Sequence, residues 1–261
     1  MKLFCLFSLA LSLAAVPLFS AAQSDDFNDN AVGPEWTLVR DDPATINVTE
    51  TNGRVEATAL AQSDPNVDAI YLSNGPSGFL LATDTNFTIT LDYTFGGFDD
   101  SAAAVGDALG LAFGVGRDLE GTDSAAIGFG VSRQQVGPIV ATGSALGAAT
   151  RIDDAQSEAI LQLFGPTSAT LEVAYDATGD DLTLGLGGGA SFTLEDTVRA
   201  VWGADDLLVS FGLRGSGFAL TPSETFLDNF TIVSGRVIPT PEPATGGILG
   251  LVILVARRRR G

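Results

Sequence analysis

Carboxylates are the side chains with which this chain could carry out acid–base chemistry. The sequence holds 32 Asp and Glu residues against 13 Lys and Arg, and it contains no histidine. Its one cysteine, Cys5, lies close to the N-terminus. The absence of histidine excludes Ser-His-Asp and Cys-His relays and histidine-zinc sites. The reaction class that stays open depends on paired carboxylates, and glycoside hydrolysis is its natural example.

The charge is concentrated in the central part of the chain. Residues 23–240 hold 31 acidic and 8 basic residues, which gives 8 − 31 = −23. Such a field repels nucleic acid and anionic lipid, whereas it tolerates divalent cations and neutral glycans. We therefore expect no nucleic-acid partner.

The first 22 residues have the composition of a secretory signal peptide. Lys2 supplies a positive start, residues 3–19 are almost entirely apolar, and small residues follow at positions 20–22. We expect export through Sec-type machinery and cleavage between Ala22 and Gln23. Because Cys5 lies within this leader, the mature chain would have no cysteine and no disulfide.

The C-terminus carries a second signal. Pro241, Glu242 and Pro243 precede an apolar run over residues 244–256, which ends in Arg257, Arg258, Arg259 and Arg260. The pattern predicts one hydrophobic helix that enters a membrane and is stopped by the four arginines. A run of this length gives roughly 20 Å of helix against a hydrocarbon core of about 30 Å, so it favours a temporary hold over a permanent span.

This order of parts resembles the PEP-CTERM sorting signal of exopolysaccharide-producing Gram-negative bacteria. The resemblance implies that a membrane-bound exosortase recognises Pro241, Glu242 and Pro243 and releases the protein beyond the inner membrane. We therefore expect transient anchoring at the inner membrane, and then a place on the cell surface or in the extracellular matrix.

Hydrophobic alternation defines the region between the two signals. Apolar residues recur at every second position in 87–95, 109–115, 127–131, 171–175, 182–186 and 207–213, which is typical of strands with one buried face. Residues 155–164 fit a short helix or a strand equally well. The sequence predicts an all-β, two-sheet jelly-roll sandwich as a single domain over residues 23–236, followed by the sorting signal over residues 237–261.

The order of these strands resembles the concanavalin A-like lectin/glucanase superfamily, and within it the legume-type lectins. Gly106-Asp107-Ala108-Leu109-Gly110-Leu111-Ala112-Phe113 is similar to their A-D-G-L-A-F strand, and Leu208-Val209-Ser210-Phe211-Gly212 stands where they have V-G-F-S. The resemblance implies that Asp107 accepts hydrogen bonds from a sugar. A groove that binds a glycan normally adds exposed aromatic residues for stacking, and only Trp36 and Trp202, with Tyr71 as a weaker third, are available. We therefore expect the glycine-rich faces of these strands to be used for packing.

Two family motifs are missing. The lectins' Glu-x-Asp-x-x-x-Asn metal site has no counterpart in residues 127–132, which contain no carboxylate. The Glu-x-Asp-x-Glu triplet of the retaining glucanases that share the fold does not occur either. We expect instead that a structural Ca²⁺ ion could join the first and last strands through Asp26, Asp228 and Asn229, because these strands pair in many sandwiches.

Three functions stay open. The sequence favours a non-enzymatic surface or matrix protein that associates with carbohydrate or exopolysaccharide. The alternatives are a carboxylate-dependent enzyme that cleaves glycans on the same fold, and a structural matrix protein without a ligand.

Overall fold

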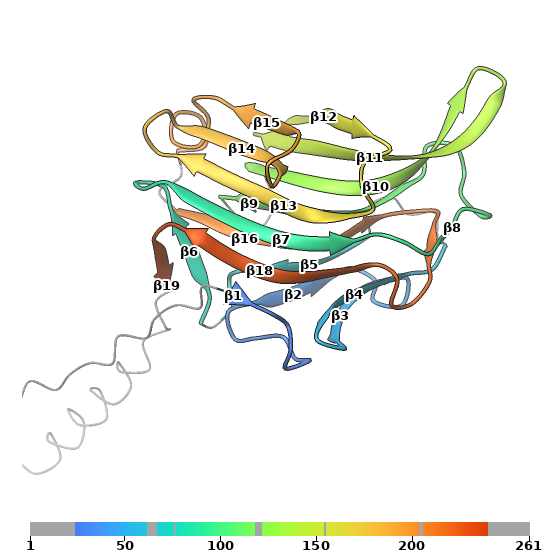
Figure 1. Cartoon of the computed structure of the whole chain (residues 1–261), viewed down its shortest axis with the longest axis horizontal. Coiled ribbons are helices and arrows are strands. Elements are labelled where there is room, and N and C mark those ends of the chain that lie inside the picture. The colour runs from blue at the N-terminus through green and yellow to red at the C-terminus, as the bar shows by residue number, and fades with distance from the viewer. Residues whose placement is uncertain are drawn as a thin grey trace, which may run out of the picture.

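The computed structural model describes residues 24–61, 67–75, 77–117, 122–153, 155–203 and 206–239 as a sandwich of two large antiparallel sheets (Figure 1). These ranges contain no α-helix, and so no helix able to cross a membrane. The all-β prediction is confirmed. The expected signal peptide, the sorting motif and the C-terminal helix lie outside these ranges.

The first sheet has eight strands, ordered β15-β14-β13-β7-β18-β4-β3, with β1 paired to β18. They are β1 (Ser24–Asp25), β3 (Ile46–Thr51), β4 (Arg54–Ala59), β7 (Phe87–Thr94), β13 (Ser168–Asp176), β14 (Asp181–Leu186), β15 (Ser191–Leu194) and β18 (Phe226–Ser234).

The second sheet has nine strands, ordered β12-β11-β10-β9-β16-β5-β2, with β6 paired to β16 and β19. They are β2 (Thr37–Arg40), β5 (Asp68–Leu72), β6 (Phe79–Ala82), β9 (Ala108–Gly116), β10 (Ser124–Val136), β11 (Ile139–Ile152), β12 (Ala155–Leu163), β16 (Asp206–Gly215) and β19 (Val237–Pro239). A short pair, β8 (Phe98–Asp99) and β17 (Ala219–Leu220), lies at one end.

The core lies between the two sheets, as the alternation predicts. The apolar positions of β7, β9, β10 and β16 are buried, and their polar or small neighbours face outward. Trp36 fills the centre, with its ring 4.9 Å from that of Phe211 and 5.1 Å from that of Phe230. Its indole nitrogen donates a hydrogen bond of 2.9 Å to Asp25 Oδ2.

Strand pairing decides two assignments that the sequence left open or placed differently. Residues 155–164, for which helix and strand were equally possible, form strand β12, because their backbone pairs with β11. The sheet also continues past residue 236, where the domain was expected to end. Val237 and Ile238 pair with Leu81 and Leu80 of β6, so β19 is part of the sandwich.

The glycines of the second sheet allow neighbouring strands to approach closely. A Cβ atom at Gly212 would lie 2.2 Å from the carbonyl oxygen of Ala69 on the adjacent strand, whereas one at Gly143 would meet nothing within 4 Å. The first substitution would force the strands apart. The second would mainly reduce the entropy of the unfolded chain.

We expect Gly212→Ala to lower the free energy of unfolding by about 1–3 kcal/mol, as overpacking usually does. Gly143→Ala serves as the matched control and is expected to be neutral or slightly stabilising. Urea denaturation of both variants checks the prediction, and equal midpoints would contradict it.

Candidate functional site

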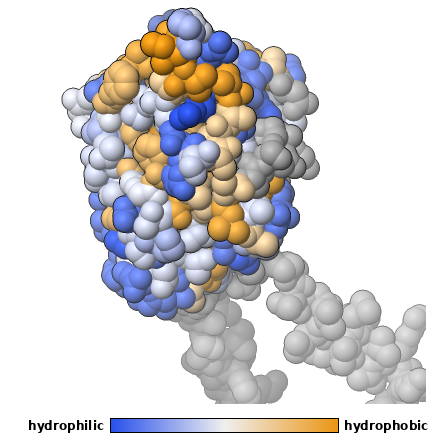
Figure 2. All heavy atoms as spheres, turned by 90° about the vertical axis from the view of Figure 1, so that its right-hand side faces the viewer, coloured by the Kyte–Doolittle hydropathy of each residue, from blue (hydrophilic) through white to orange (hydrophobic). Residues whose placement is uncertain are grey.

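The candidate site lies at one end of the sandwich, which we call the loop end. It comprises β8, the tip of the β10–β11 hairpin and the connection between β12 and β13, and the hairpin projects beyond the body there (Figure 1). Figure 2 faces this end and shows hydrophobic surface gathered towards the top, with hydrophilic surface beneath it. The exposed apolar side chains of the hairpin are Val136, Ile139 and Val140.

A pocket of about 310 Å³ opens at the loop end. Its walls come from β8, from β10 and β11 of the second sheet and from the adjoining connections. Its lining residues are Phe95, Phe98, Asp100, Phe129, Val131, Thr142, Gly143, Ser144, Phe164 and Thr167. Two of them are exposed aromatic residues: Phe98 is 42% exposed and Phe164 is 76% exposed. Exposed rings beside polar groups are typical of ligand-binding surfaces.

An ion pair fixes one side of this pocket. Arg133 Nη1 lies 2.6 Å from Asp100 Oδ2 and also donates a 2.9 Å hydrogen bond to Thr142 Oγ1. The hydroxyl of Thr142 donates in turn to Asp100 Oδ2. Since the hairpin supplies Arg133 and Thr142 while Asp100 follows β8, this network joins the hairpin to the loop after β8.

Asp107, the expected sugar-binding residue, also belongs to this end, although it does not line the pocket. Its backbone carbonyl accepts a 2.9 Å hydrogen bond from the N–H of Arg133. Its carboxylate accepts from the backbone N–H of Ala104 at 2.7 Å and from Ser216 Oγ at 3.1 Å. Asp107 therefore holds two loops together, and a role in sugar binding stays a prediction.

The three aromatic residues that were considered available for stacking on a glycan do not face the solvent. Trp36, Trp202 and Tyr71 are all core residues, because large rings between two sheets fill the core, so none of them is available. Phe98 and Phe164 are exposed instead. The signal that could have identified them is local, since Phe98 follows Gly96-Gly97 and Phe164 precedes Gly165-Pro166 outside the alternating pattern.

The residues of the expected calcium site are partly brought together. Strand β1 pairs with β18, as anticipated, with Asp25 opposite Phe230. Asp228 lies close enough to Asp26 to be affected by its charge. However, Asn229 directs its amide to Asp92 Oδ2 at 3.0 Å, and the described part of the chain groups no three carboxylates in a way that could hold a metal. The arrangement as it stands does not fit a calcium ion.

A second, polar pocket of about 360 Å³ lies on the outer face of the first sheet. Asp92 and Asp228 are directly opposite each other there on β7 and β18. Burial raises the pKa of Asp228, a hydrogen bond from the backbone N–H of Asn229 opposes this, and the charge of Asp92 raises it further. Both oxygens of Asp92 are occupied, by Thr170 at 2.6 Å and by Asn229.

Three neighbouring strands of the second sheet carry no carboxylate. Strands β9, β10 and β11 contain neither Asp nor Glu, and their outward positions hold mainly glycine and alanine. A pair of catalytic acids therefore cannot come from these three strands.

Compared with solved structures, the sandwich has the fold of two laminarinases. No protein-family model matches the chain, and no curated protein matches it by sequence.

Among the similar structures is the catalytic domain of an endo-1,3-beta-glucanase (laminarinase) from Thermotoga petrophila RKU-1. It has a TM-score of 0.51 and 11% identity, over 83% of this chain and 98% of that one. A laminarinase from Flavobacterium sp. UMI-01 has a TM-score of 0.51 and 12% identity, over 82% and 100%. The lectin UEA-II in complex with galactose has a TM-score of 0.47 and 13% identity, over 83% and 100%.

Proposed function

We propose that this protein is exported to the cell surface or extracellular matrix of a Gram-negative-type bacterium, where it binds carbohydrate or exopolysaccharide without cleaving it. The observation that carries this proposal is the loop-end pocket, in which Phe98 and Phe164 flank a cavity edged by carboxylate and hydroxyl groups. Rings offer flat apolar surface to a sugar, and carboxylates accept bonds from its hydroxyls. The fold shared with two laminarinases supports carbohydrate as the ligand class.

The non-enzymatic part of the proposal is supported by the composition of the second sheet. Glycoside hydrolysis needs two carboxylates on either side of the scissile bond. Strands β9, β10 and β11 provide none.

The export part of the proposal rests on the sequence alone. Residues 1–22 would direct the chain to Sec-type machinery. An exosortase-like enzyme would then recognise Pro241, Glu242 and Pro243 while residues 244–260 hold the chain at the inner membrane. Mass spectrometry of the protein from its host tests this route. Loss of residues 1–22 and of the C-terminal segment is expected, and an intact C-terminus on surface-exposed protein would overturn it.

We expect replacement of both Phe98 and Phe164 by alanine to weaken polysaccharide binding about 5- to 150-fold, because removal of two contact rings costs about 1–3 kcal/mol. Isothermal titration of the purified full chain against solubilised exopolysaccharide measures the effect. Asp107→Ala in the same titration tests the expected second contact, and a chelator arm tests whether calcium takes part.

The matched control for this titration is Val201→Ala. Val201 is 53% exposed and does not line the loop-end pocket. Equal affinities of the double variant and the control would contradict the proposed site. If the chain binds no glycan at all, the structural role without a ligand replaces the proposal.

The alternative function is carboxylate-dependent glycan cleavage, and one observation favours it. Asp92 and Asp228 are a facing pair in the polar pocket of the first sheet, and their proximity helps to raise the pKa of one of them. A carboxyl group with a raised pKa can serve as a general acid. Release of reducing sugar from a purified polysaccharide, abolished in Asp228→Asn, would establish this function and overturn the non-enzymatic proposal.

A further inference from the structure

The base of the loop-end pocket is apolar and belongs to the core. Phe95, Phe129 and Val131 line it, and each is at most 2% exposed. The rings of Phe95 and Phe129 meet edge to face at 5.5 Å, and the ring of Phe95 lies 6.3 Å from that of Phe98. A group that reaches the base therefore meets carbon atoms and finds no hydrogen-bonding partner from these side chains.

The rim of the same pocket is polar and partly unsatisfied. Asp100 Oδ2 is occupied by Arg133 and Thr142, whereas Asp100 Oδ1 accepts no hydrogen bond from the described part of the chain. Within the same part, the hydroxyls of Ser144 and Thr167 form no side-chain hydrogen bond. The rim thus presents one carboxylate oxygen and two hydroxyls to an incoming ligand.

The charge of the site favours a neutral ligand. Asp100 is the one acidic residue that lines the pocket, and Arg133 already neutralises it. Nη1 of Arg133 is held by Asp100 and Thr142, so the lining of the pocket carries no net charge. The volume is at the small end of the roughly 300–1,000 Å³ typical of ligand pockets, which suits about one sugar ring.

We infer that the loop-end pocket selects a neutral sugar that bears a methyl group, as a 6-deoxy sugar or an acetylated sugar does. The methyl group contacts the apolar base, and the ring hydroxyls bond to Asp100 Oδ1, Ser144 and Thr167 at the rim. A plain hexose would place a hydroxyl where the base offers no partner, and burying a hydroxyl without a partner is costly. This inference rests on the proposed function and adds the class of sugar to it.

Matched ligand pairs test this selectivity. L-Rhamnose and L-mannose differ by one hydroxyl at C6, and acetylated xylan and the same xylan after deacetylation differ by the acetyl group alone. We expect the full chain to bind the methyl-bearing member of at least one pair about tenfold more tightly or better, because an apolar pocket discriminates against an added hydroxyl by up to about 10²-fold. The pair that shows the preference identifies the source of the methyl group.

Val131→Thr and Thr167→Val separate the two parts of the pocket. Val131→Thr places a hydroxyl at the apolar base with little change of shape, so it should reduce the preference within the pair towards unity. Thr167→Val should weaken both members alike, because it removes a rim hydroxyl and keeps the shape. Equal binding of both members by the wild type would overturn the inference and leave the proposed function in place. A preference that Val131→Thr leaves unchanged would place the methyl group elsewhere and overturn it as well. Failure to bind any of the four ligands or exopolysaccharide would overturn both proposals.

Discussion

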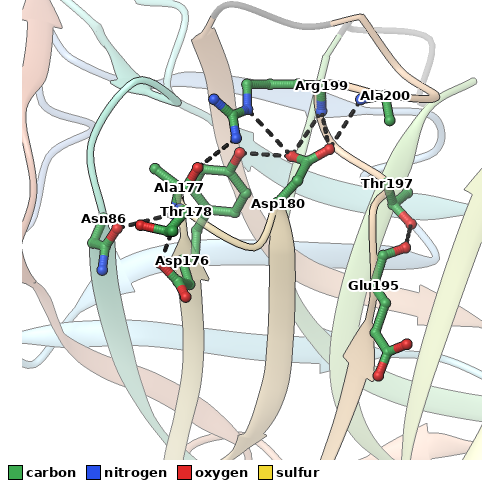
Figure 3. Close-up of polar contacts among 10 residues, drawn as sticks. Asn86, Asp176, Ala177, Thr178, Asp180, Glu195, Thr197, Arg199 and Ala200 are labelled. Atoms are coloured by element: carbon green, nitrogen blue, oxygen red, sulfur yellow. Dashed lines mark hydrogen bonds and ion pairs between the residues drawn. The ribbon is translucent and has the colours of Figure 1, made fainter.

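Replacement of Asp180 by alanine is expected to lower the free energy of unfolding by about 3–5 kcal/mol, the cost of breaking a buried charged network. Asp180 follows the turn after β13 and is 6% exposed. Its carboxylate accepts hydrogen bonds from the hydroxyl of Tyr175 at 2.6 Å and from the backbone N–H groups of Arg199 and Ala200 at 2.9 Å (Figure 3). Alanine would leave all three donors without their acceptor.

The pH dependence of this contribution follows from the same contacts. Burial would raise the pKa of Asp180, but the hydrogen bonds from Tyr175, Arg199 and Ala200 and the charge of Arg199 together lower it. A carboxyl whose pKa is lowered on folding stabilises the protein above its ordinary value of 3.8, and the stabilisation is lost as the pH falls below that value. The difference between wild type and Asp180→Asn should therefore shrink at strongly acidic pH.

Chemical denaturation at neutral pH measures the Asp180→Ala effect. Glu195→Ala is the matched control, because Glu195 is exposed and lies on the connection after β15 that also supplies Arg199 and Ala200. It takes part in the network of Figure 3 only through its backbone carbonyl. We expect the control to change the free energy of unfolding by less than about 0.5 kcal/mol. A similar loss in both variants would show that the Asp180 network does not stabilise this end.

Glu50→Gln is expected to increase the free energy of unfolding at pH 8 by about 1–3 kcal/mol. Glu50 lies on the core face of β3 and is 5% exposed, and within the described part of the chain neither of its carboxylate oxygens has a hydrogen-bond partner. Burial raises its pKa to about 7, the charge of Asp25 adds to this, and Tyr71 opposes it. Glutamine removes the buried charge while it keeps the shape.

The contribution of Glu50 to stability depends on pH in the opposite direction to that of Asp180. Because the pKa of Glu50 is raised on folding, the folded state retains a proton that the unfolded state loses. Stability is thus greatest below the ordinary value of 4.5 and falls as the pH rises towards about 7. The gain from Glu50→Gln should be large at pH 8 and close to zero at pH 4.

Thermal unfolding at these two pH values checks the Glu50 prediction. Glu158→Gln, at an exposed position of β12, is the control for the general loss of one negative charge. An equal gain in Glu158→Gln, or an equal gain from Glu50→Gln at pH 4 and pH 8, would contradict it.

Much of the fold could be predicted from the sequence, because alternation over 87–95 or 109–115 reports which face of a strand is buried. The secondary structure of residues 155–164 could not be predicted, since pairing with β11, and not local preference, makes this segment a strand. Glu50 was also detectable in principle. It follows Ile46 and Val48 at every second position of β3, which places a carboxylate on the core face.

The site was less predictable. Asp107 was singled out for its resemblance to a sugar-binding aspartate, but its partners Ala104 and Ser216 come from two separate loops that only the fold brings together. The loop-end pocket combines Phe98 of β8, Thr142 of β11 and Phe164 of the connection between β12 and β13, which are far apart in the sequence. Exposed rings in turns carry no periodic signal, so alternation could not identify them.

Hydrogen exchange of the full chain with and without bound exopolysaccharide tests most directly where carbohydrate binds. We expect protection to concentrate in residues 98–107, 133–144 and 164–167, which form the loop end. Binding accompanied by protection only on the outer face of β9, β10 and β16, or only around Asp92 and Asp228, would contradict this site.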